Sequence, residues 1–169
     1  FSTGERVPGE DMMINRRSRL LPLVLAECGL NTGEFVSEIE VTFNELANQP
    51  EWRYASGIGY AVDLAASRMA RDLALGLFLI EHKLTSSTKN NVLSKLHSRI
   101  FINFSSNLSL AQMTSLNPWL GWTNNWVAVC LNGVVSAAAF VLEPSVRFSY
   151  MKFGYDRIQP FLNGFPEDG

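Results

Sequence analysis

Two adjacent asparagines, Asn124 and Asn125, stand directly before an apolar run with helical periodicity. The first N–H groups of a helix have no partner within the helix, and the helix dipole adds positive potential at that end. Neutral amide donors placed there can hold an anion, such as a carboxylate, without carrying charge themselves. Asparagine before a helix is also an ordinary capping residue, and this alternative stays open for either member of the pair.

Aromatic residues gather around the same segment, with Trp119 and Trp122 before the helix and Trp126 at its start. Aromatic rings present large apolar faces, so one or two of them are candidates for stacking on a sugar ring. Filling the core at this junction is the alternative, and we favour it for Trp126. Trp52 and Tyr54 form a second candidate group in the loop before the central helix, where anchoring of the loop is the favoured interpretation.

Other residues that could take part in catalysis or metal binding give weaker signals. His82 ends a predicted helix and His97 lies within one, and neither position indicates a general base. Cys28 and Cys130 lack the spacing of a disulfide framework or a metal site, so we expect buried free thiols. The sequence therefore predicts no metal site and no cofactor.

Length and composition indicate a folded protein, because hydrophobic residues make up 47 % of the 169 residues and charged residues 18 %. We expect a single α-helical domain over residues 1–169. The net charge of −2 gives no general attraction for nucleic acid, and no apolar stretch is long enough to span a bilayer. Arg16, Arg17 and Arg19 form a local basic group, for which a solvated helix face is the favoured interpretation.

Helical periodicity dominates the chain. Between residues 60 and 81, apolar side chains recur at steps of three and four, while Asp63, Ser67, Arg71 and Asp72 fall on the other, polar side. No segment alternates with the period of a strand. The predicted helices cover residues 12–28, 34–47, 60–81, about 86–104, 125–142 and 146–162.

Several boundary signals refine this pattern. Pro22 either kinks the first helix or begins its second part, and Gly29 is expected to end it. Thr85 or Ser86 is expected to cap the fourth helix. A long connection should span Ser105–Thr123, and Pro144 should end the fifth helix. These elements predict an all-α fold of three successive antiparallel helical hairpins, either a bundle or part of a ring.

Three parts of the sequence resemble heparinase II/III-like polysaccharide lyases, which include the oligoalginate-type lyases. The segment Trp-Thr-Asn-Asn-Trp-Val-Ala-Val-Cys-Leu-Asn-Gly at 122–133 is similar to the Asn-Asn-Trp segment of this family. Phe-Pro-Glu-Asp-Gly at 165–169 looks like the beginning of the family's Asp-Gly-Gly segment. The helix order from Arg17 to Ser86 also follows the family's N-terminal pattern. This resemblance implies antiparallel hairpins that form part of an (α/α) toroid.

The resemblance further implies a part in cleaving uronic-acid-containing glycans by β-elimination. Asn124 or Asn125 would hydrogen-bond the substrate carboxylate, and the cleft would be walled by aromatic residues, namely Trp119, Trp122, Trp126, Trp52 and Tyr54. The expected partners are a uronate-containing polysaccharide or oligosaccharide and the remainder of the lyase chain or another subunit. A periplasmic or secreted location follows from the same resemblance.

The catalytic Tyr and His of this family are expected after the Asp-Gly turn, and this sequence ends at Gly169. The segment alone is therefore expected to be inactive. A non-catalytic helical interaction or glycan-binding domain is the alternative. The identity of the glycan, and the choice between a lyase and an epimerase, stay open at this point.

Overall fold

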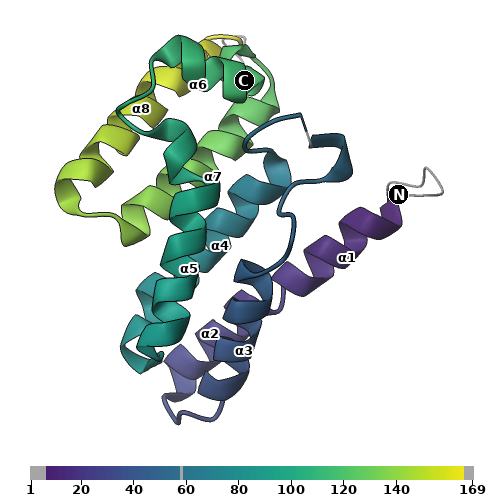
Figure 1. Cartoon of the computed structure of the whole chain (residues 1–169), viewed down its shortest axis with the longest axis vertical. Coiled ribbons are helices and arrows are strands. Elements are labelled where there is room, and N and C mark those ends of the chain that lie inside the picture. The colour runs from purple at the N-terminus through teal and green to yellow at the C-terminus, as the bar shows by residue number, and fades with distance from the viewer. Residues whose placement is uncertain (1–6, 58, 166–169) are drawn as a thin grey trace.

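The computed structural model describes residues 7–57 and 59–165 (Figure 1). Within these ranges the chain forms α-helices and short 3-10 turns, without a β-strand, so the prediction of an all-α fold is confirmed. The α-helices are α1 (Val7–Arg17), α2 (Leu20–Leu30), α3 (Val36–Ala47), α4 (Leu64–Ile80), α5 (Ser86–Arg99), α6 (Leu110–Leu116), α7 (Asn125–Val141) and α8 (Pro144–Leu162).

Helices α4 and α7 make the most extensive contact in the described part of the chain, and they run in the same direction. Gly133, at the middle of α7, lies against the backbone of Ser67 in the first turn of α4. Near their ends, the rings of Phe78 and Phe140 lie 5.3 Å apart. The second contact involves residues that lie further along both helices than those of the first. Helices α4 and α7 are therefore parallel and begin at the same end of the molecule.

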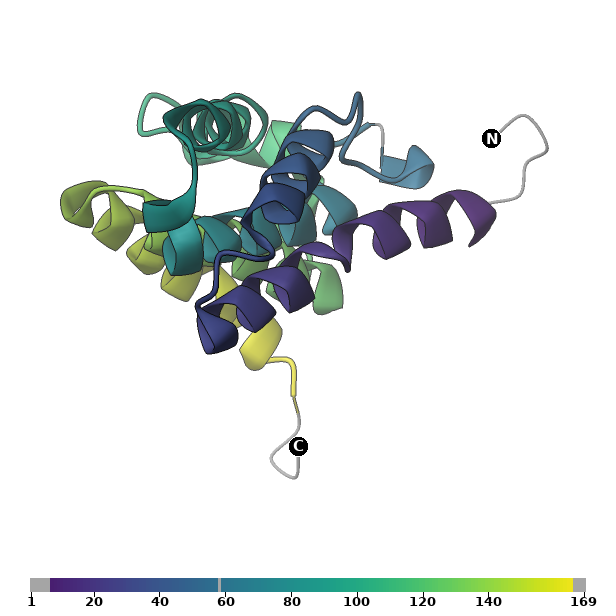
Figure 2. The same ribbon diagram turned by 90° about the horizontal axis from the view of Figure 1, so that it is seen from below.

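Helix α2 lies on the other side of α4 and also runs parallel to it. Leu20 reaches Gly76, and seven residues further on Glu27 is bonded to Lys83, just beyond the end of α4. Helices α2, α4 and α7 therefore form one layer of parallel helices. Helices α3 and α5 lie together over one face of this layer (Figure 2).

Each helix of the layer is followed by a helix that returns in the opposite direction, which gives the pairs α2/α3, α4/α5 and α7/α8 (Figure 1). In the last pair, α8 runs back along α7 and Gly154 packs against Val135. Helix α1 has no buried residue and projects from the body of the molecule (Figure 2). Formation of part of an (α/α) toroid by these pairs stays a prediction.

The first predicted helix is divided at Ser18 and Arg19 into α1 and α2. Pro22 lies in the first turn of α2, where its missing N–H is not needed, so it starts the second part of this segment instead of kinking it. Gly29 does not end the helix. Instead, α2 continues to Leu30, and Asn31 adopts the left-handed conformation, with φ 54°, that terminates it.

Two further boundaries differ from the sequence prediction. The long connection contains α6, a short helix that begins with a capping box in which Ser109 and Gln112 bond each other's backbone. Pro144 is the first residue of α8 and so begins a helix, although the sequence analysis placed it at the end of one. Thr85 caps α5 by accepting from the N–H of Thr88, as one of the two predicted alternatives requires.

The predicted polar side of α4 is largely buried, which corrects the amphipathic interpretation. Asp63 and Ser67 are 0 % exposed and Asp72 is 6 % exposed. The physical reason is the position of α4, which contacts α2, α3, α5 and α7 and is therefore enclosed on most sides. Its buried polar groups are all bonded, since Asp63 caps the helix and Asp72 binds arginines.

Gly133 should be essential for the approach of α7 to α4. A Cβ atom at this position would lie 2.3 Å from the carbonyl oxygen of Ser67, and a helix backbone cannot move aside locally. Gly133→Ala should therefore lower the free energy of unfolding by about 2 kcal/mol. Gly29→Ala is the matched control because nothing lies within 4 Å of its Cβ position, and it should stabilise the protein by about 0.5 kcal/mol. Urea denaturation measures both, and equal stability of the two variants would contradict this assignment.

Candidate functional site

The candidate site lies at the shared N-terminal end of α4 and α7. Because the two helices are parallel, both begin toward the same region. The carboxylate of Asp63 caps the start of α4, and the uncharged side chain of Asn124 caps the start of α7. Asn125 is the first residue of α7, and Trp122 and Trp126 flank it. Tyr60 joins them from the loop before α4.

The structure separates the roles of the two asparagines. Asn124 is the N-cap of α7, and its side-chain oxygen accepts a hydrogen bond of 3.0 Å from the backbone N–H of Trp126. The side chain of Asn125 is exposed and has no hydrogen-bond partner within the described part of the chain. Asn124 therefore does the capping, whereas the amide of Asn125 is available to a ligand.

Three aromatic rings form a cluster beside Asn125. The ring of Trp126 lies 5.6 Å from that of Trp122 and 5.7 Å from that of Tyr60, and both contacts are edge-to-face. The rings of Tyr60 and Trp122 are 6.1 Å apart. All three residues are only half-buried, so this aromatic cluster, Tyr60, Trp122 and Trp126, has both a packed side and a solvent-facing side. Trp126 packs partly against the core, in line with the favoured interpretation, and its contact with a sugar stays a prediction.

The other predicted cleft aromatics belong to the core. Trp119 is 0 % exposed and donates its indole N–H to the carbonyl of Val62 at 2.7 Å. Trp52 is 1 % exposed and donates to the carbonyl of Leu46 at 3.0 Å. Tyr54 is 6 % exposed. Their burial is against a cleft role for these three residues, because none of them offers a ring face to a ligand. For Trp52 and Tyr54 it agrees with the favoured interpretation, anchoring of the loop.

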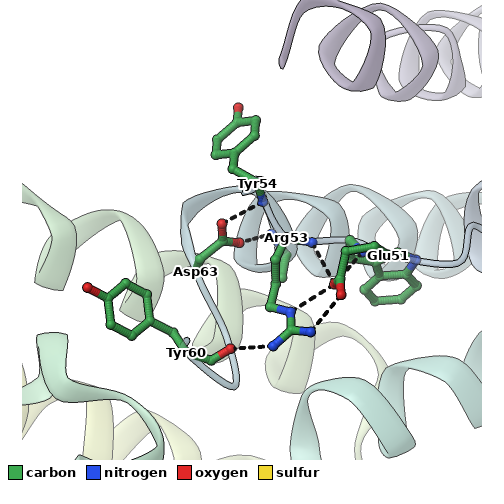
Figure 3. Close-up of polar contacts among 7 residues, drawn as sticks. Glu51, Arg53, Tyr54, Tyr60 and Asp63 are labelled. Atoms are coloured by element: carbon green, nitrogen blue, oxygen red, sulfur yellow. Dashed lines mark hydrogen bonds and ion pairs between the residues drawn. The ribbon is translucent and has the colours of Figure 1, made fainter. Parts of the chain in front are cut away.

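A network of charged residues fixes the loop that carries Tyr60 (Figure 3). The guanidinium of Arg53 donates to the carbonyl of Tyr60 at 2.7 Å and to both carboxylate oxygens of Glu51. At the end of the loop, the carboxylate of Asp63 accepts from the backbone N–H of Tyr54 at 2.8 Å and also caps α4. The backbone of Tyr60 is therefore held on one side while its ring points away from the network.

These carboxylates differ in their ionisation. Hydrogen bonds from Arg53 are the main cause that lowers the pKa of Glu51 to about 2. Burial raises the pKa of Asp63, and three backbone N–H groups and Arg53 oppose that effect without cancelling it. Glu51 is therefore firmly ionised near neutral pH, and Asp63 is the group whose charge is costly to bury.

Three arginines lie close together on the α4 side of the site. Arg17 binds one oxygen of the Asp72 carboxylate at 3.0 Å, and Arg71 binds the other at 2.8 Å. Burial lowers the pKa of Arg17; Asp72 opposes this effect, while Arg68 and Arg71 add to it. The side chain of Arg17 is only 13 % exposed, which corrects its assignment to a solvated helix face. Sequence analysis did not identify Arg68, because only the fold brings it near the others.

The histidines and Cys28 lie away from this end, whereas Cys130 is buried between α7 and the first turn of α4, next to Ser67. His82 is in the 3-10 turn Glu81–Lys83 at the far end of α4. His97 lines a hollow of about 610 Å³, whose walls are mainly apolar and come from α5, the 3-10 turn Phe101–Phe104, α6 and α8. Burial raises the pKa of the Cys130 thiol to about 12, so it stays protonated, whereas Cys28 is exposed and not buried as predicted.

The described residues include no group of three or more His, Cys, Asp or Glu side chains that could hold a metal ion. No helix among them is long and apolar enough to cross a bilayer. The second segment of the family resemblance, from Pro166 to Gly169, lies outside the described residues and contains Glu167 and Asp168.

Replacing the two asparagines should have different effects on stability. Asn124→Ala removes the N-cap of α7 and should cost about 1 kcal/mol of unfolding free energy. Asn125→Ala removes a side chain without a bonded partner and should change stability by less than about 0.5 kcal/mol. Thermal and urea unfolding of both variants test this assignment, which fails if Asn125→Ala is the more destabilising change.

The ion pair of Glu51 with Arg53 should make stability depend on pH in acid. A pKa lowered from 4.5 to about 2 means that this stabilisation is complete above pH 4.5 and is lost as pH falls toward 2. Since the pair is partly exposed, Glu51→Gln should cost only about 1 kcal/mol at pH 7, and less at pH 3. Glu45→Gln on α3 is the control, and a cost that stays constant with pH would contradict this account.

Comparison of the chain with protein-family models, curated proteins and solved structures gives no match. Its function is therefore inferred from the geometry of this end of the molecule.

Proposed function

We propose that this helical protein binds a uronate-containing glycan at the shared N-terminal end of α4 and α7, as the carboxylate-binding part of a polysaccharide lyase. One observation carries the proposal. The amide of Asn125 is exposed and unbonded at a helix start, one residue before Trp126, whose half-buried ring packs against that of Trp122. An amide donor beside aromatic faces suits a ligand that has both a carboxylate and sugar rings.

The chemistry of β-elimination explains why such donors are useful. A base removes the proton from C5 of the uronate, a double bond forms between C4 and C5, and the bond from C4 to the glycosidic oxygen breaks. The departing oxygen then takes up a proton. Negative charge builds on the carboxylate during the first step, so donors preorganised around it stabilise the transition state more than the substrate.

Asn125 and the start of α7 can supply this stabilisation. The Asn125 amide offers N–H donors, and the first turn of α7, whose cap Asn124 is uncharged, adds positive potential. The start of α4 does not contribute in this way, because the carboxylate of Asp63 already binds its N–H groups. Asn124 supports the site indirectly, because its cap fixes where α7 begins. Trp122, Trp126 and Tyr60 would bind the sugar through their solvent-facing edges and faces.

We assign carboxylate binding to this end of the molecule, but we assign no residue there as the proton acceptor. His82 follows α4, whose 17 residues span about 25 Å, so it cannot reach a proton held at Asn125. His97 lines the separate apolar hollow. The base would come from the remainder of a longer chain or from another subunit.

A helical interaction domain is the second candidate function, and α8 carries the observation that favours it. Phe148, Met151 and Tyr155 share its outer face and are 69 %, 51 % and 69 % exposed. A contiguous apolar stripe of this kind is typical of surfaces that bind another polypeptide. Light scattering tests it: self-association that Phe148→Lys abolishes supports this function, and a monomer with no added partner weakens it.

The test of the proposed function is binding of defined uronate oligosaccharides, prepared from alginate, heparin and chondroitin. At least one of them should quench tryptophan fluorescence saturably, and Asn125→Ala should weaken that affinity about tenfold, because a hydrogen bond to a charged group is lost. Asn107→Ala, an exposed asparagine in the loop before α6, is the matched control and should leave affinity unchanged.

The elimination reaction is assayed in parallel through the ultraviolet absorbance of its unsaturated uronate product. Binding without product fits the carboxylate-binding role assigned to this part. Absence of binding to all three kinds of oligosaccharide would contradict the proposal, as would equal affinities of wild type and Asn125→Ala.

A further inference from the structure

A second polar feature lies further along α4 and α7, on the face of the helix layer where Arg68, Arg71 and Asn132 come together. The two helices leave a hollow of about 260 Å³ there, lined by Arg68, Arg71, Ala128, Val129, Asn132 and Gly133. Asn132 is seven residues beyond Asn125, about 10 Å along the helix axis. This groove is therefore separate from the contact made at the start of α7.

The packing of the helices gives the groove its shape. Gly133 has no side chain and lies against the backbone of Ser67, so α7 approaches α4 unusually closely. The residues next to this contact, Arg68 on α4 and Asn132 on α7, consequently line one hollow. Ala128 adds only a methyl group to the wall, which leaves the space between the longer polar side chains open.

The charges of the groove are not balanced by the protein. Arg17 and Arg71 share the single carboxylate of Asp72. Arg68 has no ion pair or hydrogen-bond partner within the described part of the chain. Of the two guanidinium groups that line the groove, Arg71 shares Asp72 with Arg17, which lies outside the groove, and Arg68 has no carboxylate partner, so positive charge is in excess.

The available polar atoms are hydrogen-bond donors. The side-chain oxygen of Asn132 already accepts from the hydroxyl of Ser136 at 3.1 Å, which orients its amide nitrogen. That nitrogen and the guanidinium of Arg68 have no acceptor among the described residues. Guanidinium and amide donors that converge on one small hollow match a ligand that carries only acceptors.

We infer that the groove formed by Arg68, Arg71 and Asn132 binds a tetrahedral oxyanion, a sulfate or phosphate group. Such a group presents several charged acceptor oxygens in a small volume, which suits convergent donors with an excess of positive charge. It can arrive as a free ion or as an ester on a larger molecule, including a glycan held at Asn125. The inference does not require that glycan, because the groove and the start of α7 use different side chains.

The test is a titration of the full chain with sodium sulfate and with sodium phosphate, against sodium chloride at equal ionic strength. Binding is followed by two-dimensional nuclear magnetic resonance of the arginine and asparagine side-chain N–H groups. Sulfate or phosphate should shift the signals of Arg68 and Asn132 saturably. Arg68→Gln should weaken the affinity at least about tenfold, since a charge-assisted contact is removed.

Lys95→Gln on α5 removes the same charge from a different layer and should leave the affinity unchanged. Asn132→Leu is a second variant that removes the amide and fills the groove, and it should also weaken binding. Urea unfolding of each variant checks that the fold is retained. No saturable shift with either ion, or equal affinities for wild type, Arg68→Gln and Asn132→Leu, would overturn the inference.

The source of the group is distinguished with a sulfated monosaccharide, glucosamine 6-sulfate, and its unsulfated parent. If the sulfated sugar binds more tightly than free sulfate and shifts the same side chains, the group is recognised as an ester. If free sulfate binds equally well, the ion itself is the ligand. Asn125→Ala should leave sulfate binding intact, so a failure of the proposed glycan site and a failure of this groove give different results.

Discussion

The close parallel contact between α4 and α7 is the constraint on which the rest of the structure depends. Gly133 lies against the backbone of Ser67, and this contact allows two long helices to pack along most of their length. Parallel packing of successive helices requires a return helix between them, which α5 and the short segments after it provide. The same contact sets the separation of the side chains on either helix, and thereby the form of the groove at Arg68 and Asn132.

Parallel direction also has an electrostatic consequence. Antiparallel helices would place opposite dipole ends side by side, whereas α4 and α7 begin at the same end, where the carboxylate of Asp63 offsets the dipole of α4 and the α7 dipole has no charged cap. Both starts are fixed by side-chain caps, Asp63 for α4 and Asn124 for α7. With the caps thus assigned, Asn125 stays exposed beside aromatic rings, and a polar site arises from residues that are distant in sequence.

The sequence predicted what depends on local pattern. Periodic apolar residues located α3 and α7 well and gave the start of α5, because helix formation along those segments is a local property. The predicted end of α5 was wrong, since the helix stops at Arg99 and a 3-10 turn, Phe101–Phe104, follows. The sequence-based prediction failed where tertiary packing determines which side chains are buried. Asp72 was assigned to a polar surface but is buried beneath two arginines, and Trp119 was assigned to a cleft but donates to a backbone carbonyl in the core. No local signal shows which faces of α4 other helices will cover.

The candidate site was likewise predicted only in part, because some of its features depend on the tertiary structure. The Asn-Asn-Trp segment drew attention to the start of α7, yet only the structure distinguishes Asn124 as the cap from Asn125 with its unbonded amide. Tyr60 joins the site at the start of α7, and Arg68 joins the separate groove at Asn132, from parts of the chain more than 50 residues before α7. A single sequence does not indicate their proximity, because it arises from the parallel pairing of α4 with α7.

The most direct test of the glycan site is nuclear magnetic resonance mapping of the side-chain N–H groups during titration with a uronate oligosaccharide. The account predicts saturable shifts for the Asn125 amide and for the indole N–H groups of Trp122 and Trp126. The buried indoles of Trp52 and Trp119 should stay unchanged, because each donates to a backbone carbonyl in the core. Shifts confined to other parts of the chain, with the Asn125 amide unperturbed at saturation, would contradict it.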